Sequence, residues 1–259
     1  MRSEVLTLRR APRQLIATLS RPEHGNSLNS ALIRELGAAV DLAERTPDCR
    51  TLVLEGVPGL FCTGLDFEEG AAPDEGRIAG NIRISDYFRL LKRFTESPRI
   101  IVSRVDGRVI GGGAGLVAAS DVVLATERSE FSLPEALWGL LPCCVLPFLM
   151  RRVGFQKAYI MTLTTRPLGA VEAHAIRLVD ELTNDLDESL RKLTLRLNLL
   201  RDNTIVDMKR YFYQLSGIST ETEEAAISEL SRLIAQEEVQ RNIRNYVLRG
   251  TFPWEQQGV

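Results

Sequence analysis

Apolar residues along the first 180 positions fall alternately into short continuous runs and into stretches with helical spacing. The short runs, which are typical of buried strands, lie at 15–19, 52–54, 100–102 and 122–125. Between them, helical spacing extends over 32–43 and 82–94, and a glycine-led apolar stretch covers 111–119. Strands that alternate with helices in this way predict an α/β fold.

Polar and turn residues mark the ends of the predicted helices. Asn29 is a favourable N-cap for the first helix, and Thr46-Pro47 ends it. Ser97-Pro98 ends the second, because the residue before a proline is disfavoured in helical conformation. The segment 68–80 is acidic and rich in Gly, Pro and Ala, which predicts a mobile loop.

Two strand-to-loop units have the same internal spacing. Leu54 lies ten positions before Gly64, and Ser103 lies ten positions before Gly113. Units of equal length with the same order of elements indicate copies of one supersecondary structure. We therefore expect a spiralling repeat.

Beyond Asn184 the strand signals end and apolar residues fall only at helical intervals. We predict a core at 1–199 and a helical segment at 200–259. No Gly/Ser-rich linker separates them, so the helices are expected to pack on the core or on a neighbouring subunit.

Composition excludes several classes of protein. The 259 residues are 44% hydrophobic and 25% charged, which is typical of a folded globular chain. A net charge of −2 and no visible basic or aromatic patch argue against nucleic-acid binding. No apolar run approaches the roughly 18 to 20 residues that a bilayer span needs. With no apolar signal core at the N-terminus either, we expect a cytoplasmic protein that does not bind membranes.

Few side chains in the sequence are suited to metal binding. There are two histidines, His24 and His174, and four cysteines without Cys-x-x-Cys spacing. A histidine-rich metal site, a zinc knuckle and a disulfide framework are therefore not expected. The chemistry is left to carboxylates, thiols, tyrosines and the backbone, with no metal and no resident cofactor.

The run Gly111-Gly112-Gly113 opens a predicted helix and allows close approach to the backbone. Backbone N–H groups at such a turn can stabilise the negative oxygen of an enolate formed from a thioester. Two other interpretations stay open at this point. Glycines also let two elements pack closely, and a phosphate cradle is a third option, although no P-loop or dinucleotide-binding spacing is matched.

Several short motifs follow one another in a characteristic order: Arg21-Pro22 with Asn26-Ser27-Leu28, then 61–66, then Val105-Asp106-Gly107 with Gly111-Gly112-Gly113, then Ser120-Asp121, then 131–135 with Gly139-Leu140-Leu141-Pro142. In this order and spacing they resemble the enoyl-CoA hydratase/isomerase (crotonase) family over residues 13–185. The resemblance implies a crotonase-like spiral of ββα repeats, followed by a C-terminal helical segment that assembles trimers.

The resemblance also implies an active site. The two oxyanion donors of the family fall on the backbone N–H groups of Leu65 and Gly112. Of the family's two catalytic carboxylates, one falls on Glu135, while the position of the other is occupied by Gly115. A reaction that uses one acid-base group is therefore expected: dehydration, isomerisation or decarboxylation.

The run 131–148, with 151–154 and the ending 252–255, is similar to the dehydratases of polyketide β-branching cassettes. Those enzymes act on 3-hydroxy-3-methylglutaryl groups carried on an acyl carrier protein and give the 3-methylglutaconyl thioester. The resemblance thus implies a substrate held on phosphopantetheine, either of a carrier protein or of CoA. The segment 143–148 replaces a glycine-rich turn of ordinary crotonases and is expected to reshape the pocket.

The predicted substrate has a distal carboxylate, which needs a cation or several hydrogen-bond donors when it is buried. Tyr87 and Lys92 are the candidates, although five residues along an ideal helix place them about 140° apart. Cys144, Asp66 and Gly113 complete the predicted substrate-binding set. Asp66 is also expected to fix its loop by accepting backbone hydrogen bonds.

The expected partners are an acyl carrier protein and further copies of the chain, as a trimer or hexamer. Arg151, Arg152 and Lys157 form a basic cluster that could meet an acidic carrier, or simply a solvated helix face. Two rival functions stay open: another crotonase reaction, such as enoyl-CoA hydration or decarboxylation of the glutaconyl thioester, and a non-catalytic scaffold with the crotonase fold.

Overall fold

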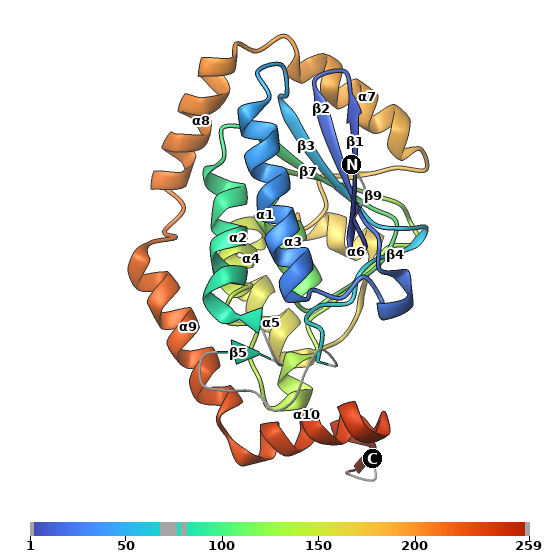
Figure 1. Cartoon of the computed structure of the whole chain (residues 1–259), viewed down its shortest axis with the longest axis vertical. Coiled ribbons are helices and arrows are strands. Elements are labelled where there is room, and N and C mark those ends of the chain that lie inside the picture. Colours follow the sequence, from blue (N-terminus) through green and yellow to red (C-terminus); the bar gives the residue numbers. More distant parts are fainter. Residues whose placement is uncertain (1–2, 68–76, 79–81, 257–259) are drawn as a thin grey trace.

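Two parallel-rich sheets organise the computed structural model, which describes residues 3–67, 77–78 and 82–256 (Figure 1). The larger sheet has the strand order β1 (Leu6–Ala11), β2 (Gln14–Leu19), β3 (Thr51–Glu55), β7 (Ile100–Val105), β9 (Val122–Ala125) and β12 (Glu181–Leu182). The smaller sheet has the order β11 (Leu168–Gly169), β10 (Glu130–Ser132), β8 (Gly107–Ile110) and β4 (Gly59–Cys62), and β5 (Arg77–Ile78) pairs with β6 (Ile82–Arg83).

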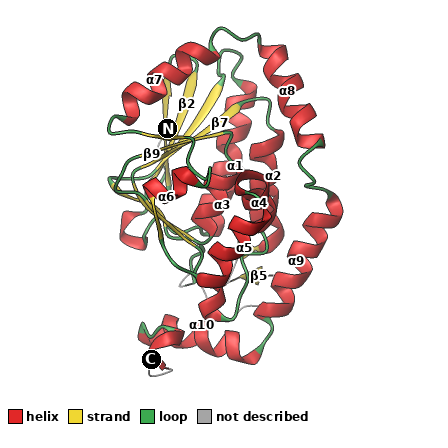
Figure 2. Ribbon diagram, turned by 180° about the vertical axis from the view of Figure 1, so that it is seen from behind, coloured by secondary structure: helices red, strands yellow, loops and turns green. Residues whose placement is uncertain are grey.

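Helices cover these sheets and extend beyond them (Figure 2). They are α1 (Ser30–Arg45), α2 (Ile84–Glu96), α3 (Gly112–Ala119), α4 (Leu146–Val153), α5 (Phe155–Thr164), α6 (Ala170–Ala175), α7 (Leu186–Leu197), α8 (Asp202–Gln214), α9 (Thr220–Ile234) and α10 (Glu237–Arg249). Three short 3₁₀ turns are η1 (Pro22–His24), η2 (Glu135–Trp138) and η3 (Pro253–Gln256). The predicted α/β class is confirmed.

The spiral consists of units with two strands and a following helix or turn. The units are β3-β4-α2, β7-β8-α3 and β9-β10-η2. Their first strands pair in parallel in the larger sheet, and their second strands pair in parallel in the smaller one. Leu54 pairs directly with Ser103, so the repeat predicted from the ten-residue spacing is confirmed. Each unit therefore ends its second strand near the same place.

The first helix forms as its pattern predicts. The Asn29 side chain accepts a hydrogen bond from the Leu32 N–H, which satisfies one of the free donors of the first turn. Residues 32, 33, 36, 40 and 43 are buried, and they form the apolar face predicted from the spacing. This face holds α1 against α2 and the larger sheet.

Strand β1 was not predicted from the sequence. It lies at the edge of the larger sheet and pairs only with β2, in antiparallel register. Its second half contains Arg9 and Arg10, so the apolar alternation that marks a half-buried strand stops after Leu8. Charged residues are common on edge strands because they discourage pairing with other chains.

The C-terminal helices pack on the core through α8 and α9, which both contact α2, while α10 continues around its lower end (Figure 1). A buried lysine fixes this arrangement. Lys209 on α8 donates to the carbonyl oxygens of Phe94 and Arg99, at 2.9 and 2.8 Å, and to Asp121 Oδ2 at 2.6 Å. The boundary at residue 200, between α7 and α8, stays a prediction. The loop predicted at 68–80 lies almost entirely outside the described residues.

Within the described ranges, every helix is too short or too polar to cross a lipid bilayer.

Candidate active site

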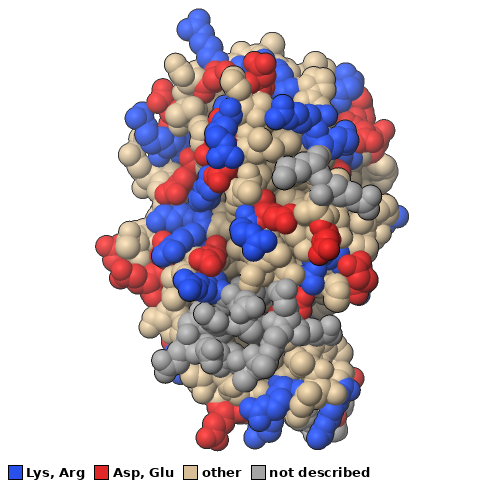
Figure 3. All heavy atoms as spheres, in the orientation of Figure 1, with Lys and Arg blue, Asp and Glu red and all other residues tan. Residues whose placement is uncertain are grey.

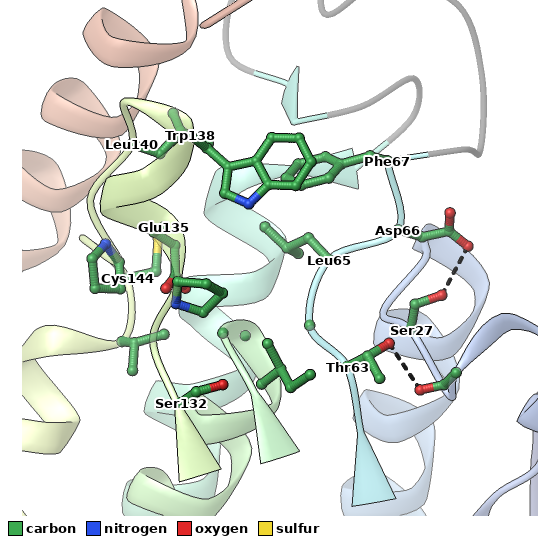
Figure 4. Close-up of a pocket in the computed structure, with 18 of the residues that line it drawn as sticks. Ser27, Thr63, Leu65, Asp66, Phe67, Ser132, Glu135, Trp138, Leu140 and Cys144 are labelled. Atoms are coloured by element: carbon green, nitrogen blue, oxygen red, sulfur yellow. Dashed lines mark hydrogen bonds between the residues drawn. The ribbon is translucent and has the colours of Figure 1, made fainter. Parts of the chain in front are cut away.

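A cavity of about 580 Å³ opens where β4, β8 and β10 end (Figure 4). The turn after each strand contributes to its lining: Gly64 and Leu65 follow β4, Gly111 and Gly112 follow β8, and Glu135 follows β10. The repeat of the fold therefore brings together three groups that are up to 71 residues apart in sequence. The predicted catalytic residues Leu65, Gly112 and Glu135 share this cavity.

The Leu65 N–H is directed by a short parallel bridge to Leu28. The Leu28 N–H donates to the Gly64 oxygen at 2.7 Å, and the Asp66 N–H donates to the Leu28 oxygen at 3.0 Å. In a parallel pair these bonds use the groups on either side of the bridged residue, so the Leu65 N–H points away from Leu28. In the described part of the chain, this N–H has no hydrogen-bond partner.

Gly112 is the first residue of α3, where backbone N–H groups have no partner within the helix. Gly111, just before it, adopts φ +53° and donates its N–H to the Ser132 oxygen at 2.9 Å, which ties α3 to the end of β10. At Gly64, with φ +93°, a side-chain Cβ would lie 3.2 Å from the Gly112 nitrogen. Glycine at 64 thus lets the two turns approach, so that two backbone donors line one cavity.

Glu135 begins η2, directly after the turn that follows β10. Its Oε1 would lie 3.0 Å from a Cβ at Gly111, and its Oε2 is buried with no hydrogen-bond partner among the described residues. Burial raises the pKa of Glu135 to about 7. A carboxyl group with this pKa can take up and release a proton near neutral pH, which is what a general acid-base group requires.

Tyr87 and Lys92, both on α2, lie in different surroundings. Tyr87 is fully buried, lines the cavity and donates its hydroxyl to the Gly112 oxygen at 2.5 Å. Burial, with Cys144 nearby, raises the pKa of its phenol well above the ordinary value. Lys92 is not part of the described lining, and its Nζ pairs with Glu223 Oε2 at 3.3 Å. Their predicted roles in binding substrate stay predictions.

The other predicted binding residues are placed as follows. Cys144 lines the cavity, and burial raises the pKa of its thiol. Asp66 lines it too, and its Oδ2 accepts from the side chains of Arg21 at 3.0 Å and Ser27 at 3.1 Å, so these side chains tie the carboxylate to the loop before α1, while the predicted backbone hydrogen bonds stay a prediction. Gly113 faces β4 instead: a Cβ there would lie 2.5 Å from the Cys62 oxygen. Their roles toward substrate also stay predictions.

The sequence did not indicate two further parts of the lining. One is an aromatic wall around Trp138, whose ring centroid lies 5.2 Å from that of Phe67 and 5.3 Å from that of Tyr246. Phe252 and Trp254, stacked at 4.7 Å, complete it from the end of the chain. The motif similarity at 252–255 was the only signal in this region, and it carried no information about where that segment lies.

The second unpredicted part is a cationic margin. His24 and Arg108 line the cavity, and the Arg108 side chain forms no hydrogen bond or ion pair with any described residue. Arg108 lies on β8, two positions before Ile110, and adjacent side chains of a strand alternate between its faces. Arg108 and Ile110 therefore share the face of β8 that lines the cavity.

Comparison with known proteins gives consistent results. A family model described as enoyl-CoA hydratase/isomerase matches residues 15–257. Bacillaene synthase dehydratase PksH of Bacillus subtilis is 36% identical over 241 residues, which cover 93% of this chain and 92% of that protein. A probable enoyl-CoA hydratase of Rhodobacter capsulatus is 35% identical over 173 residues, covering 66% of each chain.

Among solved structures, a putative polyketide biosynthesis enoyl-CoA hydratase (pksH) from Bacillus subtilis superimposes with a TM-score of 0.87. It is 32% identical, and the match covers 96% of this chain and 99% of that one. The match extends well past residue 185, where the motif similarity seen in the sequence ends, and includes most of the C-terminal helices.

Proposed function

The chain belongs to the enoyl-CoA hydratase/isomerase family, and on that premise we propose that it is a dehydratase of 3-hydroxyacyl thioesters. The proposed reaction converts 3-hydroxy-3-methylglutaryl into 3-methylglutaconyl on an acyl carrier protein, without a resident cofactor. The observation that supports it best is one buried carboxyl group, with a pKa of about 7, beside two backbone N–H groups that have no partner among the described residues.

The proposed steps balance with one acid-base residue. The Glu135 carboxylate takes the α-proton, and the electron pair of that C–H bond moves onto the thioester oxygen to form an enolate. The Leu65 and Gly112 N–H groups hold this oxygen while its charge develops. The enolate then reforms the carbonyl, the β C–O bond breaks, and Glu135 returns its proton so that the hydroxyl leaves as water.

The similarity to PksH supports a polyketide context, because that relative is named a dehydratase of bacillaene synthase. A basic depression on the surface supports an acidic protein partner. It lies between α1 and α2 and is lined by four arginines, at 34, 83, 89 and 93, together with Asp86. In Figure 3, basic side chains gather over this face with acidic ones between them. Arg34 and Arg83 are exposed and unpaired within the described ranges.

In the basic cluster noted in the sequence, at 151, 152 and 157, both arginines form hydrogen bonds within the protein. Arg151 donates to the Ala118 oxygen, and Arg152 donates to the Ser120 and Leu178 oxygens. These bonds tie α4 to the end of α3 and to the loop before β12, so the depression between α1 and α2 is the better candidate for carrier docking. Replacement of Arg34 and Arg83 by Glu should raise KM for a carrier-bound substrate roughly tenfold and leave KM for a pantetheine thioester unchanged. Replacement of Arg9 and Arg10, both exposed on the edge strand β1, by Glu is the matched control.

Two pairs of residues are candidates for the distal carboxylate of the substrate. Tyr87 and Lys92 were predicted from the sequence, and His24 and Arg108 line the cavity. Arg108→Met and Lys92→Met separate these alternatives, since loss of the cation that binds the carboxylate raises KM for the dicarboxylic substrate. A thioester that lacks the distal carboxylate is the control, because its KM should not respond to the relevant substitution.

We further propose that copies of the chain assemble as a homotrimer, which could pair into a hexamer, in the cytoplasm. Large apolar side chains are exposed on α5, where Phe155 is 68% exposed, and on α8, where Phe212 is 67% exposed. Apolar surface of this kind is typical of protein interfaces. The four cysteines are free, as expected in a reducing compartment. Light scattering of the intact protein tests the mass, and Phe212→Lys should lower it if α8 is the interface.

The decisive experiment for the reaction uses the full-length protein and three substrates: 3-hydroxy-3-methylglutaryl on a carrier protein, on CoA and on pantetheine. Intact-mass spectrometry should show loss of water, fastest from the carrier-bound form. No loss of water would refute the proposed reaction. Loss of carbon dioxide from the glutaconyl thioester, or uptake of water by a simple enoyl-CoA, would instead favour the rival crotonase reactions. Thermal stabilisation by thioester without turnover would favour a scaffold.

A further inference from the structure

The hydroxyl of Tyr87 connects α2 to the first residue of α3. The ring is fully buried in the core, and the hydroxyl donates to the Gly112 oxygen at 2.5 Å. Gly112 also supplies the backbone N–H that lines the cavity. A side chain from one helix therefore holds the same residue whose backbone points into the site.

The hydroxyl fits only because residue 115 has no side chain. A Cβ at Gly115 would lie 2.1 Å from the Tyr87 hydroxyl oxygen, closer than any real contact allows. Gly115 lies within α3, where glycine is less favourable than alanine. Its presence is therefore not explained by helix stability, and the room that it leaves is filled by the phenol.

The bond adds a side-chain restraint to a stretch of glycine backbone that is otherwise held only by backbone hydrogen bonds, among them the one from the Ala114 N–H to the Gly111 oxygen at 2.8 Å. Three consecutive glycines, at 111, 112 and 113, have no side chains to hold their conformation. The Gly111 N–H is fixed on one side by the Ser132 oxygen, and the Gly112 carbonyl is fixed on the other by Tyr87. The Gly112 N–H belongs to the peptide unit between these two anchors, so Tyr87 restrains its direction in addition to the bond that Ala114 makes to the same unit.

We infer that Tyr87 is a positioning residue for the backbone oxyanion hole, and that Gly115 is required because it makes room for the Tyr87 hydroxyl. Tyr87 acts through Gly112 and need not touch the substrate. Burial keeps the phenol protonated, so the hydroxyl remains a donor throughout the physiological pH range. This inference rests on the proposed function in one respect, because the dehydration is the reaction whose kcat is measured.

Tyr87→Phe tests the hydrogen bond, because it keeps the buried ring and removes only the hydroxyl. We expect kcat for dehydration to fall about tenfold with KM within twofold, since the hole acts mainly on the transition state. We also expect a smaller downward shift of the carbonyl stretch of a bound, unreactive acyl-pantetheine thioester in the infrared spectrum. Tyr213→Phe, which removes a hydroxyl from α8 outside the cavity lining, should change neither quantity.

Gly115→Ala tests whether the missing side chain at residue 115 makes room for the Tyr87 hydroxyl. It also tests the positioning role of Tyr87 if Tyr87→Phe fails to fold. In the wild-type background the added methyl displaces the hydroxyl, so kcat should fall at least tenfold and Tm should drop. In the Tyr87→Phe background the closest contact is removed, and the side chains of Leu91 and Val145, each 3.1 Å from the added Cβ, still have to adjust. The same substitution should therefore cause a much smaller loss of kcat and of Tm than it does in the wild type.

Unchanged kcat and carbonyl frequency in Tyr87→Phe would overturn the positioning role. Equal effects of Gly115→Ala in both backgrounds would overturn the role of Gly115. The infrared measurement needs no turnover, so it separates this inference from the proposed reaction. If the carbonyl shift behaves as expected but no water is lost from the substrate, the proposed dehydration alone fails.

Discussion

The two sides of the cavity differ in what they offer a substrate. The side formed by the turns after β4 and β8 presents backbone N–H groups, at Leu65 and Gly112, and glycines that let these turns approach. The side formed after β10 presents side chains: the carboxyl of Glu135, the ring of Trp138 and the Cys143-Cys144 pair. Equivalent positions in successive repeats thus differ in chemical character. We call the side with the backbone N–H groups the electrostatic wall and the side with Glu135 the acid-base wall.

This difference follows from what comes after each strand. After β8 the chain enters α3, which is buried along its whole length, so only its first N–H can face the cavity. After β10 it enters the short 3₁₀ turn η2, which brings the Glu135 carboxyl group into the cavity. In the proposed mechanism one side would act through fixed dipoles that do not titrate, and the other through a carboxyl group whose pKa is raised to about 7.

Glu135→Gln removes the acid-base wall and keeps its shape. We expect kcat to fall about 10³-fold, because an amide cannot accept the α-proton. Carbonyl frequency of a bound unreactive thioester should stay as in the wild type, since the backbone donors are untouched. A variant with normal turnover would remove Glu135 from the proposed mechanism.

Gly112→Pro removes one donor of the electrostatic wall. Proline is tolerated at the first position of a helix and lacks an N–H, so α3 should still form. The expected loss is about 10²-fold in kcat, as for removal of one oxyanion donor. Gly112→Ala retains the N–H and is the matched control. Similar kcat values for the proline and alanine variants would contradict a role for this donor.

Gly111→Ala affects the contact between the two walls. The new Cβ would lie 3.0 Å from Glu135 Oε1, at a backbone conformation that alanine adopts less easily than glycine. Both effects should move the carboxyl group away from the backbone donors, with a loss of about tenfold in kcat and a lower Tm, since a residue held in such a conformation costs about 1 to 3 kcal/mol. Steady-state kinetics and thermal unfolding measure the two quantities. An unchanged kcat would show that the walls act without this close contact.

A change of pH affects only the acid-base wall, and its expected effect is the smallest. The kcat/KM of the wild type should rise as Glu135 ionises, through a pKa of about 7. Because this folded pKa lies above the ordinary value of 4.5, the protonated carboxyl favours the folded state. Its stabilising contribution is complete below pH 4.5 and is lost as pH rises through 7.

Glu135→Gln should therefore be more stable than the wild type at pH 8, and the two should converge near pH 4. Each unit of pKa shift corresponds to about 1.4 kcal/mol, so the difference at pH 8 should be about 3 kcal/mol by urea unfolding. Parallel stability curves for the two proteins would mean that Glu135 is not buried in the way described.

The regular parts of the fold were accessible from sequence because local rules decide them. Asn29 caps α1 through a bond to a residue three positions away, and the apolar face of α1 follows from its spacing. The repeat was visible because Leu54 and Ser103, which pair in the sheet, each lie ten positions before a loop glycine, Gly64 and Gly113. Strand β1 escaped detection because its pairing with β2, and not its own pattern, makes it a strand.

The order of elements, the glycines of the two turns and the carboxylate of the third could all be read from the sequence. The tertiary structure alone decided what surrounds them. It placed Tyr87 in the room left at Gly115, paired Lys92 with Glu223, and brought Phe252 and Trp254 back onto the cavity. Spacing along a chain fixes which face a residue takes within its own element, whereas contacts between elements depend on how those faces pack in space.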